Sequence, residues 1–301
     1  MGISERMIAV VGAGLLLAAG GCSRGEEKAQ AVASPVEQPV AAGAAVRESE
    51  VPGVALVALS DLPRSPESGA VDEACEGYRA KGLTATGEAV AARGWVVVSE
   101  ARLGRYRVVS FVSGFDPGTS AICFGRNGNV GVFDGTRLVA LAYDTSAESA
   151  SFGSNRTAGR LEPMDNGALL VWGDSPGSPL GELHLGQDGL RLTPTAAERS
   201  FCQRKVVVPN VYDKPIQTAR RALLARGWEP VPMEEEGTPY DGTADLTRSG
   251  VVEVQSCSGT GVGYCAFKYR GPGGVLDVTT VGGPEEDGNT VVSYAVACRG
   301  D

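Results

Sequence analysis

Apolar and polar positions divide the chain into a leading apolar run, a polar linker and a folded part. The run Met7–Cys22 has no charged residue and follows Arg6. Its length fits the core of an export signal rather than a membrane span. Residues 23–50 are rich in Ala, Glu, Val, Gln and Pro and lack periodicity, which predicts a disordered tether. Residues 51–200 and 201–301 are expected to form two small domains.

In residues 51–200, short valine-rich runs alternate with turn formers, as in an antiparallel meander. Short helices are expected at 71–81 and 88–93. Gly82 and Gly94 follow them and can adopt a left-handed cap conformation at low cost. The run 54–59 is either a leading strand or the end of the tether. Strands are expected at 96–98, 106–112, 120–124, 130–133, 137–143, 168–172, 180–185 and 189–192.

In residues 201–301, the pattern predicts one helix packed on an antiparallel sheet. Asp213 can cap this helix, with Pro215 in its first turn and Gly227 at its end. One helix face is apolar and consists of Ile216, Ala219 and Leu223. Strands are expected at 206–211, 251–254, 264–269, 275–281 and 290–297. The predicted fold class is therefore α+β and β-rich: two small domains with antiparallel sheets, short helices and disulfide bonds.

The end of the leading run resembles the lipobox of bacterial lipoproteins. Ala19, Gly20 and Gly21 precede Cys22, and in that family signal cleavage leaves such a cysteine lipid-modified at the mature N-terminus. Ser23 is not the aspartate that retains enterobacterial lipoproteins in the inner membrane. The resemblance therefore implies a lipid anchor in a bacterial outer membrane, on its periplasmic face, or on the outer face of a single membrane. The alternative is a cleaved secretory signal with an incidental cysteine.

The charge balance argues against nucleic acid as a partner. Lys and Arg total 27 against 36 Asp and Glu, a net charge of -9. Such a surface repels a polyanion overall. The 42 glycines and few aromatic residues favour turns and strands over long helices. No second apolar run is long enough to span a bilayer.

Six cysteines remain for disulfides if Cys22 carries lipid. Position along the chain favours pairing Cys75 with Cys123, Cys257 with Cys265, and Cys202 with Cys298. An internal repeat leaves an alternative open, since Ala92–Trp95 and Ala225–Trp228 share the sequence Ala-Arg-Gly-Trp. If the halves are duplicates, Cys202 pairs with Cys265 and Cys257 with Cys298. Zinc is disfavoured because no Cys-x-x-Cys occurs and the single histidine, His184, is distant in sequence.

The stretch Val208-Pro209-Asn210-Val211, followed by a helix, resembles the opening of PASTA domains. Val254–Cys257 is similar to that family's later Gln-Ser-Pro segment, with cysteine in place of proline. The likeness covers about forty residues. It implies noncatalytic contact with peptidoglycan or its fragments and transfers no ligand residue. Shared helix-to-sheet geometry is the alternative explanation.

One stretch matches the Gly-x-Ser-x-Gly letters of serine hydrolases. Ser175 would be the nucleophile and His184 the only histidine available as base. A nucleophile elbow requires a strand before the serine and a helix after it. Pro179 disfavours a helix there, so a plain turn is the alternative.

Three further features have competing explanations. The glycine-rich segment 257–265 is either a phosphate loop or, as we expect, a disulfide-closed hairpin tip. The tryptophans either form a sugar-stacking platform or, as we expect, pack in the core. They are Trp95, Trp172 and Trp228. The acidic run Glu234–Glu236, with Asp241 and Asp245, is either a calcium site or, as we expect, a solvated loop.

Together these features predict a noncatalytic envelope lipoprotein that uses no cofactor and no metal. Its expected partners are the membrane, through the lipid anchor, and a periplasmic protein or cell-wall component such as peptidoglycan. A serine hydrolase using Ser175 and His184 is the alternative from a different class.

Overall fold

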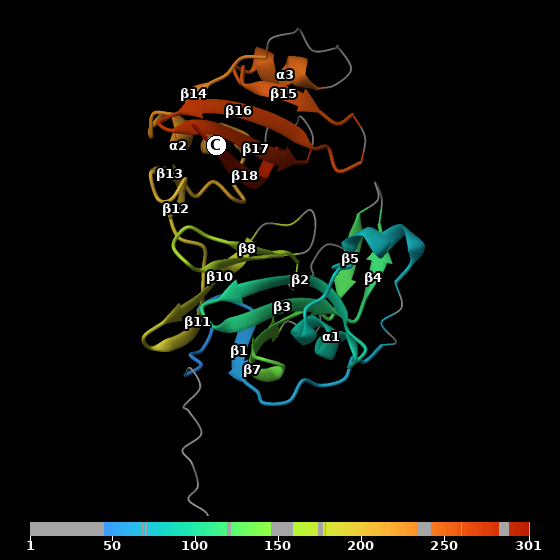
Figure 1. Cartoon of the computed structure of the whole chain (residues 1–301). Helices are drawn as coiled ribbons and strands as arrows, with labels where there is room; N and C mark the ends of the chain where they lie inside the picture. The colour runs from blue at the N-terminus through green and yellow to red at the C-terminus, as the bar shows by residue number, and fades with distance from the viewer. Residues whose placement is uncertain are drawn as a thin grey trace, which may run out of the picture. The chain divides into compact units, whose positions relative to one another are not determined.

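The structure, a computed structural model, describes residues 45–67, 69, 71–118, 122–145, 159–173, 177, 179–233, 242–259, 261–282 and 289–300. These residues belong to one compact unit. They form a β-rich protein with several small antiparallel sheets and short helices (Figure 1). Several parts of the predictions lie outside the described residues: the leading run with Cys22, residues 23–44 of the tether, Ser175, and Glu234–Glu236 with Asp241.

A five-stranded antiparallel sheet, here the N-terminal sheet, organises the first region. Its order is β1 (Val54–Ala58), β7 (Arg137–Asp144), β6 (Asn129–Asp134), β3 (Tyr106–Val112) and β2 (Val96–Leu103). Beyond Ser113, the β3–β6 pair continues as a ribbon of β4 (Gly114–Pro117) and β5 (Cys123–Arg126). Alternate residues of these strands point to opposite faces, so the sheet can be buried on both sides.

A four-stranded sheet, here the middle sheet, packs on one face of the N-terminal sheet. Its order is β11 (Gly189–Thr193), β10 (Pro179–Gly186), β9 (Leu169–Trp172) and β8 (Leu161–Pro163). Leu103 and Val108 share a buried cluster with Leu169 and Leu183. The opposite face is covered by α1 (Ala85–Ala91), whose Val90 packs with Phe111 and Trp95.

The second region contains the C-terminal sheet and a two-stranded hairpin. The sheet has the order β14 (Glu229–Pro230), β16 (Cys265–Gly271), β17 (Gly274–Val281) and β18 (Thr290–Cys298), and β15 (Val254–Cys257) also pairs with β16. The hairpin consists of β12 (Glu198–Phe201) and β13 (Val206–Pro209). The predicted apolar face of α2 (Ile216–Leu224) is buried, as Ile216, Ala219 and Leu223 are at most 2% exposed.

Several local predictions need correction. Pro215, not Asp213, is the N-cap of α2, and it makes no side-chain cap bond; Asp213 instead has a φ of 58°. The short elements β4, β8, β12 and α3 (Thr243–Arg248) were not predicted. Residues 45–50, which the sequence assigns to the tether, run along β11, where the Arg47 N–H donates to the Leu190 carbonyl at 2.9 Å.

Three disulfides join Cys75 to Cys123, Cys202 to Cys298, and Cys257 to Cys265. These are the pairs expected from position along the chain, and the alternative derived from duplication does not occur. The two Ala-Arg-Gly-Trp segments both end a helix, with φ values of 86° at Gly94 and 78° at Gly227. The repeat is therefore a shared helix-ending turn. None of the helices in the described ranges is long and apolar enough to cross a bilayer.

Candidate functional site

One polar cluster lies on the outer face of the middle sheet, where this sheet packs against the second region. One cross-strand row of this face contains Glu162, Leu170, Glu182 and Thr193, because each is the register partner of the next. Leu170 and Trp172 share a core cluster with residues of the second region, including Tyr212 and Tyr294. Glu162 and Glu182 therefore lie where the middle sheet meets the second region.

Arg199 of β12 reaches across this boundary to Glu162. Its Nη2 donates to Glu162 Oε1 at 2.5 Å, and its Nη1 donates to the Tyr212 hydroxyl at 3.1 Å. The side chain is only 7% exposed. Its Nε has no hydrogen-bond partner among the described residues. The carboxylate of Glu162 thus offsets the buried positive charge of Arg199, as a buried guanidinium requires.

The second oxygen of Glu162 is also occupied. Glu162 Oε2 accepts a hydrogen bond from Trp172 Nε1 at 3.0 Å. The same oxygen forms an ion pair with Arg160 Nη2 at 3.0 Å. The Arg160 guanidinium lies 4.7 Å from the centre of the Trp172 ring, within cation–π range. Glu162 therefore binds groups from three positions and is not free to act as a base.

Aromatic rings close the cluster. Trp172 meets Tyr212 edge-on at 5.7 Å, and Tyr212 lies 4.4 Å from Tyr294. Burial is the main reason that the pKa of Tyr212 rises to about 12. Burial also raises the pKa of Tyr294. Both phenols therefore stay neutral at physiological pH and act as packing and hydrogen-bonding groups.

His184 lies beside Glu182 on β10, on the same face. The two side chains approach to 3.3 Å between Nε2 and Oε2, and the Ala196 N–H donates to Glu182 Oε1 at 2.8 Å. Burial opposes ionisation of Glu182, but the bonds from His184 and Ala196 outweigh it and leave its pKa below the ordinary value. The structure thus pairs the predicted base with an acid. The proposed nucleophile, Ser175, lies outside the described residues.

The strand context of the serine motif is described on both sides. β9 ends at Trp172, and the next element is β10, which begins at Pro179 and pairs antiparallel with β9. A strand–serine–helix elbow would need a helix in that place. The observed context agrees with the alternative of a connection between two strands.

A second polar group is buried in the C-terminal sheet. Glu253 is fully buried; its Oε1 accepts bonds from Tyr269 Oη at 2.7 Å and Arg220 Nε at 2.9 Å. Burial, followed by the charge of Glu253, raises the pKa of Tyr269. Because Arg220 belongs to α2, this network fastens the helix to the sheet.

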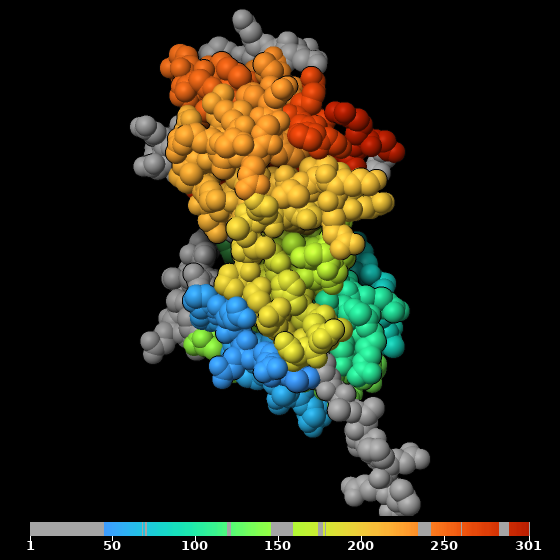
Figure 2. Space-filling view, turned by 90° about the vertical axis from the view of Figure 1, so that its left-hand side faces the viewer, coloured from blue at the N-terminus to red at the C-terminus, as the bar shows by residue number. Residues whose placement is uncertain are grey.

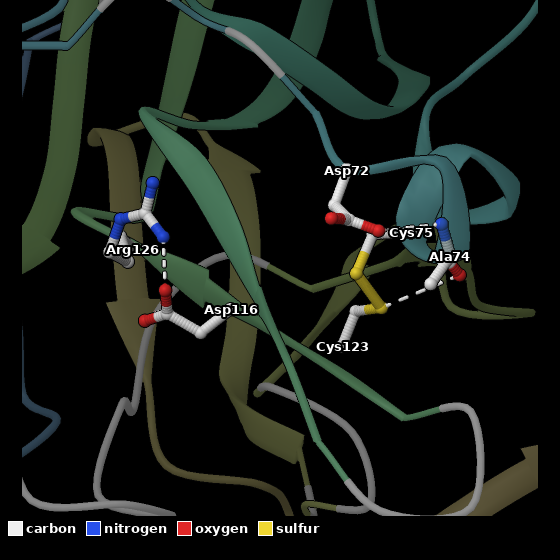
Figure 3. The surroundings of a disulfide bond; sticks show 6 residues. All are labelled: Asp72, Ala74, Cys75, Asp116, Cys123 and Arg126. Atoms are coloured by element: carbon white, nitrogen blue, oxygen red, sulfur yellow. Dashed lines mark hydrogen bonds and ion pairs between the residues drawn. A yellow bond between two sulfur atoms is a disulfide. The ribbon is translucent and has the colours of Figure 1, made fainter.

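A third polar cluster lies by the Cys75–Cys123 disulfide, in the β4–β5 ribbon. Figure 3 shows Arg126 directed at Asp116, with which it forms an ion pair. Arg126 Nε also donates to Glu67 Oε1 at 3.1 Å and to Oε2 at 3.0 Å. The hydrogen bond with Arg126 is the main cause of the lowered pKa of Glu67. This cluster fixes the segment around Glu67 against the ribbon.

The tryptophans and the glycine-rich segment follow their structural explanations, whereas Glu234–Glu236 and Asp241 lie outside the described residues. All three tryptophans are at most 7% exposed, so they do not form an open stacking platform. The segment 257–265 connects paired strands and is closed by its disulfide. Asp245 belongs to α3 and pairs with Arg248. Within the described ranges, no three His, Cys, Asp or Glu side chains are grouped as metal ligands.

A small apolar cavity lies between the N-terminal and middle sheets. Its volume is about 10 Å³, and its lining includes Val130, Val171 and Leu183. Such a space holds at most one water molecule, and an apolar lining gives water few partners. The cavity is a packing gap rather than a ligand site. Comparisons with models of known protein families, with curated proteins and with solved structures give no match.

Proposed function

We propose that this protein is a noncatalytic envelope lipoprotein, anchored through Cys22, whose folded part binds a periplasmic protein or a cell-wall component. The observation that carries the proposal is the set of three disulfides. Disulfides form and persist mainly outside the reducing cytosol. They therefore support export, which the apolar run before Cys22 predicts.

The polar cluster supports a binding role. Glu162, Arg199 and Tyr212 bond to one another and to neighbouring side chains. A catalytic constellation needs groups that are held in place yet directed at a substrate. The side chains of this cluster bond to each other instead. They hold the two regions in one arrangement, and the outer surface of that arrangement is available to bind a partner.

The anchor is tested by replacing Cys22 with alanine and separating membrane and soluble fractions of the producing cells. We expect the variant to leave the membrane fraction, while a matched Ser23→Ala variant stays there. Membrane retention of both variants would show that Cys22 is not the anchor.

The binding role is tested with the chain that begins at Ser23, immobilised and exposed to detergent-solubilised envelope proteins and, separately, to insoluble peptidoglycan. The PASTA resemblance around Val208–Val211 favours the second arm. We expect saturable retention in one arm. Retention no greater than on a denatured, reduced sample of the same chain would contradict the proposal.

A serine hydrolase remains the second candidate because the structure pairs His184 with Glu182 at 3.3 Å. A histidine held by a carboxylate is the general-base half of such a site. A fluorophosphonate probe separates the two candidates. The proposal expects no labelling, whereas labelling that disappears in Ser175→Ala and in His184→Gln would establish the hydrolase.

A further inference from the structure

Two arginines of the N-terminal sheet lie directly opposite each other on neighbouring strands. Arg102 of β2 is the register partner of Arg107 of β3. No described acidic side chain forms an ion pair with either of them. Like charges in directly opposed positions destabilise a sheet. Among the described residues, therefore, no ion pair offsets this unfavourable contact.

Two more arginines lie at the same end of this sheet. Arg105 is in the turn after β2, and Arg137 begins β7 after the β6–β7 turn; pairing of β3 with β6 puts both turns at one end. Both arginines share Asp134, at 3.6 and 3.9 Å, and both are more than half exposed. We call Arg102, Arg105, Arg107 and Arg137 the arginine end.

The nearest other carboxylate in the sheet is already occupied. Glu100 is two residues before Arg102 on β2, but its Oε1 accepts the Thr84 N–H at 3.0 Å and its Oε2 accepts the Thr84 hydroxyl. Asp188, on the β10–β11 turn, accepts a bond from Arg47 with its backbone carbonyl at 3.2 Å, and its carboxylate forms no ion pair with the arginine end among the described residues. The arginine end thus keeps an excess of positive charge in a chain of net charge -9.

The chain enters the fold at this end. The Leu190 N–H donates to the carbonyl of Ala45 at 2.7 Å. Leu185 is the register partner of Leu190, and a Cβ on Gly104, in the β2–β3 turn, would lie 2.8 Å from Leu185 Cδ2. In Figure 2, the blue atoms of the first described residues and the green atoms of residues around 100 lie on either side of the yellow atoms of residues around 190.

An exposed leucine lies at the same end of the sheet, beside Arg137 and at the opposite edge from Arg102. Leu59 follows β1, and its N–H donates to the Val139 carbonyl at 3.3 Å, two residues from Arg137. Its exposed fraction is 37%. Arg137 with the adjacent Leu59 suits the interface of a charged lipid layer.

We propose that the arginine end docks on the phosphate headgroups of an anionic lipid layer. The proposal rests on the lipid anchor at Cys22 and names a surface that this anchor would hold at the membrane. Arginine binds phosphate with two parallel hydrogen bonds, and a phosphate between Arg102 and Arg107 would offset their repulsion.

The disordered tether that the sequence predicts would make this docking effective. Residues 23–44 separate the lipidated cysteine from the first described residue. A flexible chain of that length averages roughly 25 Å end to end. The arginine end, where the chain enters, is thereby kept within reach of the headgroups at a high effective concentration.

The test uses the unlipidated chain from Ser23, which retains the whole compact unit, and co-sedimentation with vesicles. We compare phosphatidylcholine vesicles with vesicles that also contain phosphatidylglycerol, at low salt. We expect binding to the anionic vesicles alone. The double variant Arg102→Gln, Arg107→Gln should bind the anionic vesicles about 25-fold more weakly, because each basic side chain near an anionic surface strengthens binding roughly fivefold. The matched control, Arg204→Gln with Arg270→Gln, removes two exposed charges from the second region and should bind as the original chain does.

Thermal unfolding distinguishes docking from a structural role. The Arg102, Arg107 double variant should unfold at the same or a higher temperature, because a like-charge contact is removed. A lower unfolding temperature, equal losses in both double variants, or no preference for anionic vesicles would overturn the proposal. The Cys22→Ala fractionation fails or succeeds independently, since these vesicle measurements involve no lipid anchor.

Discussion

The three disulfides enclose loops of very different length, and this difference gives a quantitative prediction. Cys202–Cys298 spans 96 residues, and Cys257–Cys265 spans 8. If a disulfide acts by restricting the unfolded chain, the longer bridge contributes about 4.7 kcal/mol and the shorter about 2.5 kcal/mol at 25 °C. Replacing both cysteines of a pair by serine should therefore cost about 2 kcal/mol more for the long bridge.

The comparison is made by urea unfolding of the two double variants under oxidising conditions. Trp172 and Trp228 are buried in the core cluster of the second region, so their fluorescence reports its loss. Both variants exchange two cysteines for two serines, so the effect of this change in composition cancels when their free energies of unfolding are compared. An equal or larger loss for the Cys257, Cys265 variant would refute the argument from unfolded-chain entropy.

Two other substitutions or conditions test packing and charge. Gly271→Ala would place a Cβ against the buried Trp228 ring and should lower the free energy of unfolding by about 1–3 kcal/mol. In the control Gly77→Ala, the new Cβ meets nothing within 4 Å. This control should leave the free energy of unfolding nearly unchanged in the same urea assay. The pKa of Glu182 is lowered from 4.5 in the folded chain, so its contribution is present above pH 4.5 and is lost as the pH falls below that value. Unfolding measured between pH 6 and pH 3 should show a smaller acid loss in Glu182→Gln, and an unchanged profile would contradict this assignment.

The sequence predicted the elements whose apolar pattern is long enough to be unambiguous. Strands β3, β7 and β10 and the buried face of α2 follow directly from alternating or helical spacing. The predicted antiparallel, β-rich fold class is confirmed. The elements that were missed are short, and β8 and β12 carry Glu162 and Arg199, which resemble loop residues in a single sequence.

The candidate site was largely beyond sequence reasoning for the same reason. Glu162 and Arg199 are 37 positions apart, and neither belongs to a recognisable motif. Their burial depends on the register of β8, β9 and β10, which a single sequence does not determine. The sequence showed that Glu182 and His184 lie two residues apart on one strand. Only the structure showed that their side chains are in contact.

The polar cluster also bears on the division of the chain at residue 200. Leu170 and Trp172 precede that position, yet they share one core cluster with Tyr212 and Tyr294. Apolar contact alone is non-directional, so it would allow the second region several arrangements on the middle sheet. The bonds from Arg199 to Glu162 and Tyr212 have defined geometry and favour one of them. The polar cluster therefore acts as a joint that makes two predicted domains into one unit.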